Sequence, residues 1–231
     1  PDALRISGGR VEVSGQDLFG LSEARMQEVR GRRVAMIFQN AMSALNPVQT
    51  VGRQVAETLR LHTRLRGAAL RERVVTLFHE VGIPDPEQRF DFFPHQLSGG
   101  QQQRVMIAMA LACEPDVLIA DEPTTALDVT IQLQVLNLIR ELTRSRQLAV
   151  LLITHDMGVV KNTADEVAVM YRGELIERAS VEDFFHHPQQ AYSRRLIDAL
   201  PDLTHFREAA VEAPLLELEN VKVWFPIRRG L

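Results

Sequence analysis

Short, wholly apolar runs alternate with amphipathic stretches along this chain. Three runs are continuously hydrophobic, namely VAMIF at 34–38, VLIA at 117–120 and LAVLLI at 148–153. Such runs are typical of strands that are buried on both faces of a parallel sheet. Between them, apolar residues recur every three or four positions, which predicts helices. The pattern therefore predicts an α/β fold whose parallel sheet is covered by helices on both faces.

The residues before the first apolar run predict two small elements. Alternation over residues 11–13, flanked by glycines, predicts a short antiparallel hairpin. Ser22 can then cap a helix that runs to Arg30. The strand at 34–38 ends at Gln39, and a polar loop that closes with Asn46-Pro47 follows it.

The long stretch between the first two runs predicts mainly helices. Residues 51–82 have helical periodicity and divide into two helices at Gly67. Three prolines between 84 and 94 interrupt this pattern. The next helix begins near Ser98 and continues to about Cys113, where Glu114-Pro115 ends it.

The last part of the chain changes character twice. A long helix with an apolar face over 131–142 precedes the third apolar run, and a short helix follows it. Residues 166–170 and 174–179 predict a strand pair around Arg172-Gly173. Past Leu200 the chain is polar and irregular, and LLELENVKVWFPI at 215–227 then predicts one more alternating strand.

Composition narrows the possible functions. The 231 residues fit one domain, or one domain and a fragment of another. A net charge of −4 argues against a protein whose main task is to bind nucleic-acid phosphates. No apolar stretch approaches the ~20 residues of a membrane-spanning helix, and the single cysteine excludes an internal disulfide. These features predict a cytoplasmic compartment.

Candidate chemistry lies at the ends of the predicted strands. Asp121 and Glu122 directly follow the VLIA strand, which places two carboxylates at the sheet edge where α/β folds collect ligands. In phosphoryl-transfer sites one such carboxylate holds Mg²⁺ and another orients or deprotonates the attacking water. Gln39 and His155 end the other two strands, where an amide or an imidazole can reach the metal, the water or a phosphate. Each of these features alone is common in structural roles.

A further candidate is the string LSGGQQQRV at 97–105. A serine and two glycines at a helix start leave backbone N–H groups exposed at the positive end of the helix dipole, which favours an anion such as a terminal phosphate. An ordinary N-cap serine is the alternative for this string alone.

Taken in order, these features resemble the nucleotide-binding subunit of ATP-binding cassette (ABC) transporters over about residues 1–200. The matches are Gln39 to the Q-loop, Leu97 to Gln101 to the signature, Asp121-Glu122 to the Walker B pair, Ala126 to Asp128 to the D-loop, and His155 to the switch histidine. The resemblance implies an α/β P-loop NTPase (RecA-like) core of an ABC ATPase with an inserted helical subdomain, lacking its N-terminal P-loop portion.

The same resemblance implies roles for these residues toward ATP and Mg²⁺. Asp121 and Gln39 would hold Mg²⁺, Glu122 would be the general base toward water, and His155 and Gln39 would complete the γ-phosphate site. The signature would close over ATP held by a second cassette. The residues implied to contact that nucleotide are Ser98, Gly99, Gly100, Gln101 and Asp128.

The expected organisation follows from this resemblance. Residues 1–44 and 114–200 form the two parts of the RecA-like core, and residues 45–113 form the helical subdomain that ends in the signature helix. Residues 201–213 form a linker, and residues 214–231 start a second, truncated cassette. The chain thus reads as a piece of a protein with two fused cassettes.

Longer strings resemble the dipeptide/oligopeptide importer branch, which also includes nickel and glutathione importers. They include MIFQNAMSALNP and FFHHPQQAYSRRL, although Asn40-Ala41 departs from the acidic-Pro pair of that branch. The implied partners are transmembrane permease subunits, a second ABC cassette and, indirectly, a periplasmic or extracellular solute-binding protein, with no nucleic acid. The implied location is peripheral, at the cytoplasmic face of the membrane. Peptide, glutathione and nickel stay equal candidates for the solute.

The sequence contains no GxxxxGK[ST] motif, whose lysine and N–H groups hold the phosphates of a nucleotide. We therefore expect these 231 residues alone to be inactive, and the intact protein to be an ATPase. Two alternatives stay open, a soluble ABC-type ATPase of DNA repair or translation, and a non-catalytic regulatory cassette.

Overall fold

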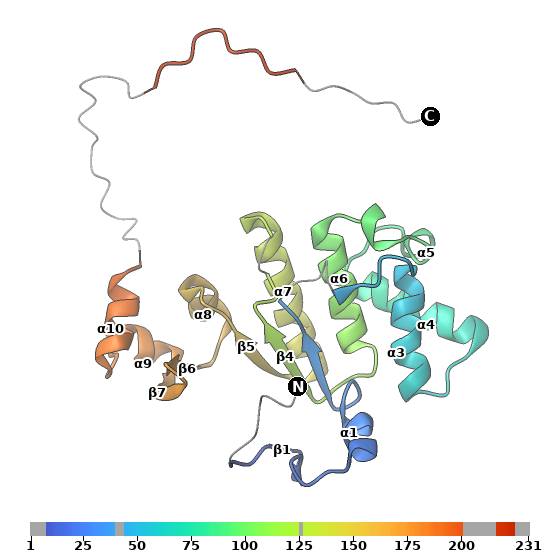
Figure 1. Cartoon of the computed structure of the whole chain (residues 1–231), viewed down its shortest axis with the longest axis horizontal. Helices are drawn as coiled ribbons and strands as arrows, with labels where there is room; N and C mark the ends of the chain where they lie inside the picture. Colours follow the sequence, from blue (N-terminus) through green and yellow to red (C-terminus); the bar gives the residue numbers. More distant parts are fainter. Residues whose placement is uncertain (1–7, 40–43, 125–126, 201–215, 225–231) are drawn as a thin grey trace.

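The computed structural model describes residues 8–39, 44–124, 127–200 and 216–224, and the account below concerns these residues (Figure 1). The loop position Asn40-Ala41, the D-loop residue Ala126 and the expected linker at 201–213 lie outside them. Within the described ranges, no helix has the length and apolar character needed to cross a membrane.

A three-stranded parallel sheet forms the centre of the fold. Its order is β3 (Val34–Ile37), β4 (Val117–Asp121) and β5 (Ala149–Ile153). In the register, Ile37 lies opposite Ala120, and Ala120 lies opposite Leu152. The predicted parallel sheet is confirmed. Because parallel strands end at the same edge, the residues after these three positions are brought together there.

Helices fill the chain between β3 and β4 (Figure 1). They are α3 (Val51–His62), α4 (Gly67–Glu80), α5 (Pro86–Arg89), a 3₁₀ turn at Pro94–Gln96, and α6 (Gly99–Leu111). The predicted division at Gly67 is confirmed, since Gly67 begins α4 with a φ of 57°. Helix α5 was not predicted from the proline-rich stretch. Pro86 stands in its first turn, where a missing N–H costs no helical hydrogen bond.

The main core lies on one face of the sheet, against α6 and α7 (Val129–Arg146). Ala35, Ile37 and Leu118 pack there and are at most 4% exposed. The opposite face is more open, because Met36 is 38% and Leu151 is 56% exposed. The prediction of a sheet covered on both faces is therefore wrong for the described residues. Continuous apolar runs indicate that a strand can be buried, but not which segment covers each face.

Smaller elements flank the sheet. The predicted hairpin is formed by β1 (Glu12–Val13) and β2 (Gln16–Asp17). Helix α1 (Glu23–Val29) begins after Ser22 as predicted, although the Ser22 side chain makes no capping hydrogen bond. Beyond β5 follow α8 (Met157–Thr163), the antiparallel pair β6 (Glu166–Tyr171) and β7 (Glu174–Ser180), α9 (Val181–His186) and α10 (Ala191–Asp198). This C-terminal group has its own small core around the fully buried Phe184.

A buried carboxylate fastens α10 to β7. Glu177 is 8% exposed, and it accepts hydrogen bonds from the backbone N–H groups of Gln189 and Gln190 at 2.8 and 3.0 Å. Burial alone raises the pKa of Glu177, but the nearby Ser193 hydroxyl and the hydrogen bonds from these two N–H groups outweigh it and lower that pKa. The ionised carboxylate is thus part of the folded state.

The alternating segment near the C-terminus does not form the predicted strand. Residues 216–224 contain no assigned strand, and they lie apart from the rest of the described chain (Figure 1). Leu216, Leu218 and Trp224 are 69 to 86% exposed. An alternating pattern becomes a strand only when a partner strand takes up its hydrogen bonds, and the described residues provide none there.

Candidate functional site

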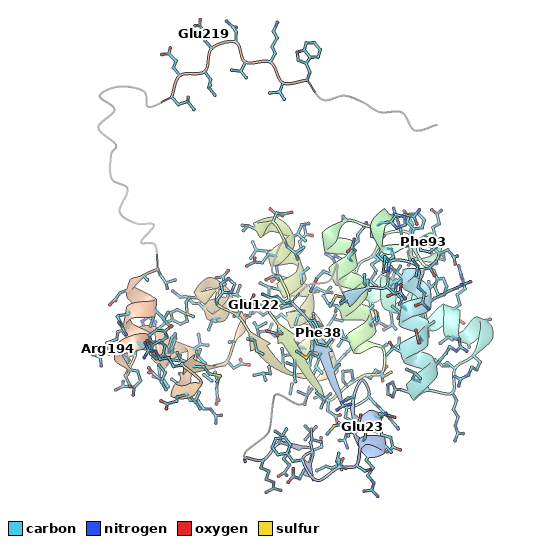
Figure 2. All side chains as sticks on the ribbon, in the orientation of Figure 1. Glu23, Phe38, Phe93, Glu122, Arg194 and Glu219 are labelled. Atoms are coloured by element: carbon cyan, nitrogen blue, oxygen red, sulfur yellow. The ribbon has the colours of Figure 1, made fainter. Side chains whose placement is uncertain are left out.

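Three predicted residues meet at the carboxyl edge of the sheet. The amide Nε2 of Gln39 donates to Oε2 of Glu122 at 2.5 Å, and Nδ1 of His155 lies 2.9 Å from Oε1 of the same carboxylate. Figure 2 labels Glu122 at this edge, together with Phe38, which precedes Gln39. The side chain of His155 is 78% exposed and that of Glu122 is 23% exposed. The strand ends therefore converge on one partly shielded carboxylate.

The backbone at Glu122 has a conformation that is unusual for a residue with a side chain. Its φ is 43°, in the left-handed region, directly after β4 ends at Asp121. Its N–H donates to the carbonyl of Ile153 at the end of β5, at 2.9 Å. This bond ties the two strand ends together. Residues held in such sparsely populated conformations collect at functional sites, where the surrounding structure enforces them.

The oxygen ligands at this edge suit Mg²⁺ only if water and substrate phosphates supply the rest of its shell. Asp121 is half-buried at the end of β4, and Gln39 keeps an amide oxygen beside the Glu122 carboxylate. Across the described ranges, no group of three or more His, Cys, Asp and Glu residues could hold a metal ion. Mg²⁺ commonly binds one or two protein oxygens and completes its shell with water and substrate phosphates. Asp121 and Gln39 fit that arrangement.

The predicted signature forms the capped start of α6. The hydroxyl of Ser98 accepts from the N–H of Gln101 at 3.3 Å, and the side-chain Oε1 of Gln101 accepts from the N–H of Ser98 at 3.1 Å. This reciprocal capping box satisfies two N–H groups that a helix end otherwise leaves unpaired. Ser98 and Gly99 are exposed. The helix start is thus accessible to a ligand.

The signature packs against the residues that follow the D-loop. A Cβ added to Gly100 would lie 2.7 Å from Cγ2 of Ile131, whereas one added to Gly99 would come no nearer than 3.8 Å, to Leu127. Asp128 caps α7, because its carboxylate accepts from the N–H of Ile131 at 3.0 Å. Ile131 therefore lies against both Gly100 and Asp128.

Sequence reasoning missed three polar side chains near these groups, of which Gln54 and Gln102 are buried and Gln132 is half-buried. Gln102 on α6 holds the turn before Ser98, and Gln54 on α3 holds the loop at 46–49 through the carbonyls of Asn46 and Gln49. Gln132 on α7 donates to Asp156, the residue that caps α8, at 3.0 Å. The sequence signal that could have identified these side chains is a glutamine within a hydrophobic helical pattern.

The comparison with protein families decides the classification. Residues 3–125, more than half of the chain, match the family described as ABC transporter. This chain belongs to the ABC transporter family. The matched range contains Gln39, the signature at the start of α6, and the Asp121-Glu122 pair.

Curated relatives of this ABC chain are ATP-binding proteins of transporters. It is 52% identical over 202 residues to the probable peptide ABC transporter ATP-binding protein y4tR of Sinorhizobium fredii, which covers 87% of this chain and 60% of y4tR. It is 47% identical over 223 residues to the peptidoglycan transport ATP-binding protein YejF of Agrobacterium fabrum, covering 96% of this chain and 41% of YejF. The chain thus spans between two-fifths and three-fifths of these relatives.

A solved structure agrees with the ABC assignment. The ATP-binding cassette MJ0796, in a dimeric post-hydrolysis state bound to ADP and Pi, superposes with a TM-score of 0.68 at 27% identity. The match covers 76% of this chain and 74% of that one. The fold is therefore that of an ABC ATPase with a P-loop NTPase core, as the motifs predicted.

Proposed function

We propose that this chain is part of an ATP-hydrolysing subunit that energises an ABC importer of peptides. This proposal rests on the position of Gln39 and His155, which both contact the carboxylate of Glu122. Phosphoryl transfer is catalysed mainly by such positioning and by electrostatic stabilisation. The names of y4tR and YejF support transport, with peptides as the favoured solute class. No observation favours DNA repair, translation or a regulatory cassette.

Glu122 is the proposed general base. Its Oε2 accepts from Gln39 and its Oε1 lies beside Nδ1 of His155, so the carboxylate is held at the edge where the three strands end. A carboxylate positioned in this way can take a proton from the attacking water. Since Nδ1 of His155 is engaged by Glu122, its Nε2 is the atom that would meet the γ-phosphate or the water.

Asp121 and Gln39 are the proposed protein ligands of Mg²⁺. When bound, the ion neutralises charge on the phosphates of ATP. Within the chain, the hydrogen bond from Nε2 of Gln39 to Glu122 fixes the orientation of the Gln39 amide. Its oxygen and the Asp121 carboxylate then remain for the ion.

The signature is proposed to act on ATP that a second cassette holds. Ser98 and Gly99 are exposed at the positive end of α6, where they can meet a terminal phosphate. Gly100, Gln101 and Asp128 would shape the same surface. The second cassette is either part of the same protein or another chain, and residues 214–231 are the proposed start of a fused one.

We propose that residues 45–113 form the helical subdomain and that its first loop contacts a permease at the cytoplasmic face of the membrane. Gln54, 6% exposed, holds this loop by accepting from the N–H of Asn46 at 2.9 Å and by donating to two of its carbonyls. The loop displays Val48, which is 82% exposed. A rigid loop with an apolar tip suits a protein partner. A solute-binding protein would act indirectly, through that permease.

Cross-linking tests this partner. Single cysteines at Asn46 or Ala44, both exposed, should form cross-links to a permease in membranes, in a background that lacks Cys113. A cysteine at the exposed Glu182 on α9 is the control and should give none. Cross-links that map only to a soluble partner would refute the transporter proposal.

The catalytic proposal is tested first by the coding sequence upstream of Pro1. A GxxxxGK[ST] motif there supplies the phosphate cradle, and its absence from the whole gene product leaves a regulatory cassette. The second test is MgATP hydrolysis by the protein expressed from its full gene. Activity that disappears in Glu122→Gln supports the assignment, whereas unchanged activity refutes it.

A further inference from the structure

The segment that leads into the signature is short and irregular. It begins at Phe93, labelled in Figure 2, passes through the 3₁₀ turn at Pro94–Gln96 and ends at Ser98. Phe93 also stacks on His95, with ring centroids 5.7 Å apart. The turn in this segment makes two backbone hydrogen bonds, from the N–H of Gln96 to the carbonyl of Phe93 and from the N–H of Leu97 to the carbonyl of Pro94, both at 3.0 Å. The side-chain partners of the segment then help to decide where Ser98 lies.

Three glutamines supply side-chain partners. Oε1 of Gln96 accepts from the N–H of Phe93 at 2.8 Å, and Oε1 of Gln101 accepts from the N–H of Ser98 at 3.1 Å. Gln102 instead donates, from Nε2 to the carbonyls of Pro94 at 2.9 Å and of Leu97 at 3.2 Å. Of the three, Gln102 is the buried one, at 5% exposure.

Gln102 holds the chain on both sides of Ser98. Its side chain binds the carbonyl of Leu97, which belongs to the peptide before Ser98, and its backbone N–H binds the carbonyl of Ser98 itself at 2.9 Å. Leu97 is only 6% exposed. Without the Gln102 donor, water has little access to replace the lost hydrogen bonds, so the turn would have to rearrange.

We propose that Gln102 is a positioning residue for Ser98, which fixes the 94–97 turn and thereby the place of the signature N–H groups at the terminal phosphate. The effect on the terminal phosphate rests on the proposed ATPase function, whereas the effect of Gln102 on the 94–97 turn does not. The required property is a buried hydrogen-bond donor at the end of a side chain of this length. Gln102→Met keeps the length and loses the donor, whereas Gln102→His places a ring N–H donor at the same number of bonds from the backbone.

The first experiment needs no activity and uses this 231-residue chain. Amide hydrogen exchange should be at least ten-fold faster at Leu97 and Ser98 in Gln102→Met than in wild type, and near wild type in Gln102→His. Amides of α3 are the internal reference for an intact fold, and Gln27→Met, at an exposed position on α1, is the control. Equal exchange in Gln102→Met and wild type overturns the proposal, as does equal acceleration in both variants at residue 102.

The second experiment uses the protein expressed from its full gene. Gln102→Met should lower kcat for MgATP at least ten-fold without changing nucleotide affinity, and Gln102→His should restore kcat to within about three-fold of wild type. An unchanged kcat in Gln102→Met would overturn the positioning role. Absence of hydrolysis in wild type would instead contradict the proposed function. The hydrogen-exchange result would still decide whether Gln102 fixes the 94–97 turn.

Discussion

Nδ1 of His155 lies 2.9 Å from Oε1 of Glu122, although 33 residues separate them in the sequence. The parallel register produces this contact, since β4 and β5 run side by side and both residues follow the strand ends. The shared carboxylate makes Glu122 the residue whose replacement tests the site most directly.

Glu122→Gln should keep nucleotide binding and stop turnover. The amide preserves the shape of the carboxylate but removes the base, and loss of a general base reduces rates by about 100- to 10,000-fold. The measurement is kcat and nucleotide affinity in the protein expressed from its full gene. Glu182→Gln, at an exposed position on α9, should leave both unchanged. A loss of affinity equal to the loss of kcat would argue that Glu122 binds rather than reacts.

Ser98→Arg should abolish turnover and leave nucleotide affinity unchanged in the protein expressed from its full gene. A bulky cation at the exposed start of α6 would block the approach of the proposed second cassette. Ser22→Arg is the matched control, because Ser22 also precedes a helix but makes no side-chain cap. Equal loss of ATP binding and turnover in Ser98→Arg would contradict the role assigned to the signature.

Gly100→Ala should destabilise the fold, whereas Gly99→Ala should not. The new methyl at 100 would lie 2.7 Å from Ile131, and overpacking of this kind typically costs about 1–3 kcal/mol of unfolding free energy. At Gly99 the nearest atom is 3.8 Å away. Denaturant unfolding of both variants is the measurement. Adding Ile131→Ala to Gly100→Ala should relieve the clash, and equal stability of the two glycine variants would disprove it.

Acid should weaken the attachment of α10 through Glu177. Since its folded pKa is lowered, this carboxylate stabilises the fold fully above its unfolded pKa of about 4.3, and that contribution is lost as pH falls through the lower folded value. The unfolding free energy should therefore fall less steeply with acid in Glu177→Gln than in wild type between pH 6 and 3. Glu174→Gln, exposed on the same strand, should follow wild type. Parallel curves for Glu177→Gln and wild type would refute the linkage.

The 231-residue chain alone should bind MgATP too weakly to be detected by calorimetry. It contains no P-loop lysine, and Asp121 and Glu122 place negative charge where the phosphates would lie. Glu122→Gln in the same chain is the comparison. Tight, magnesium-dependent binding by wild type would mean that the nucleotide site has been placed wrongly.

The features that could be predicted from the sequence are those that depend on hydrophobic periodicity and on the positions of strand ends. Continuous apolar runs located β3, β4 and β5, and parallel pairing then required Gln39, Glu122 and His155 to share an edge. Their roles came from the family resemblance and remain proposals. The family and the fold were predicted correctly.

Other features depend on neighbours that no pattern identifies. The partners of Gln102 and Glu177 are backbone groups of adjacent turns, and residue type alone does not reveal them. Two predictions failed for the same reason, namely that both faces of the sheet are covered and that the segment at 215–227 forms a strand. The sheet face at Leu151 is open and residues 216–224 form no strand, because burial and pairing require a second segment.

The left-handed backbone of Glu122 has a consequence for protein engineering. A side chain in this conformation costs roughly 1–2 kcal/mol, and replacement by glycine is a standard way to recover stability at such positions. Here that substitution would delete the carboxylate that Gln39 and His155 share. A thermostability screen that ignores turnover would therefore reward the loss of the proposed base, so any stabilised version of this cassette should be selected with residue 122 held fixed.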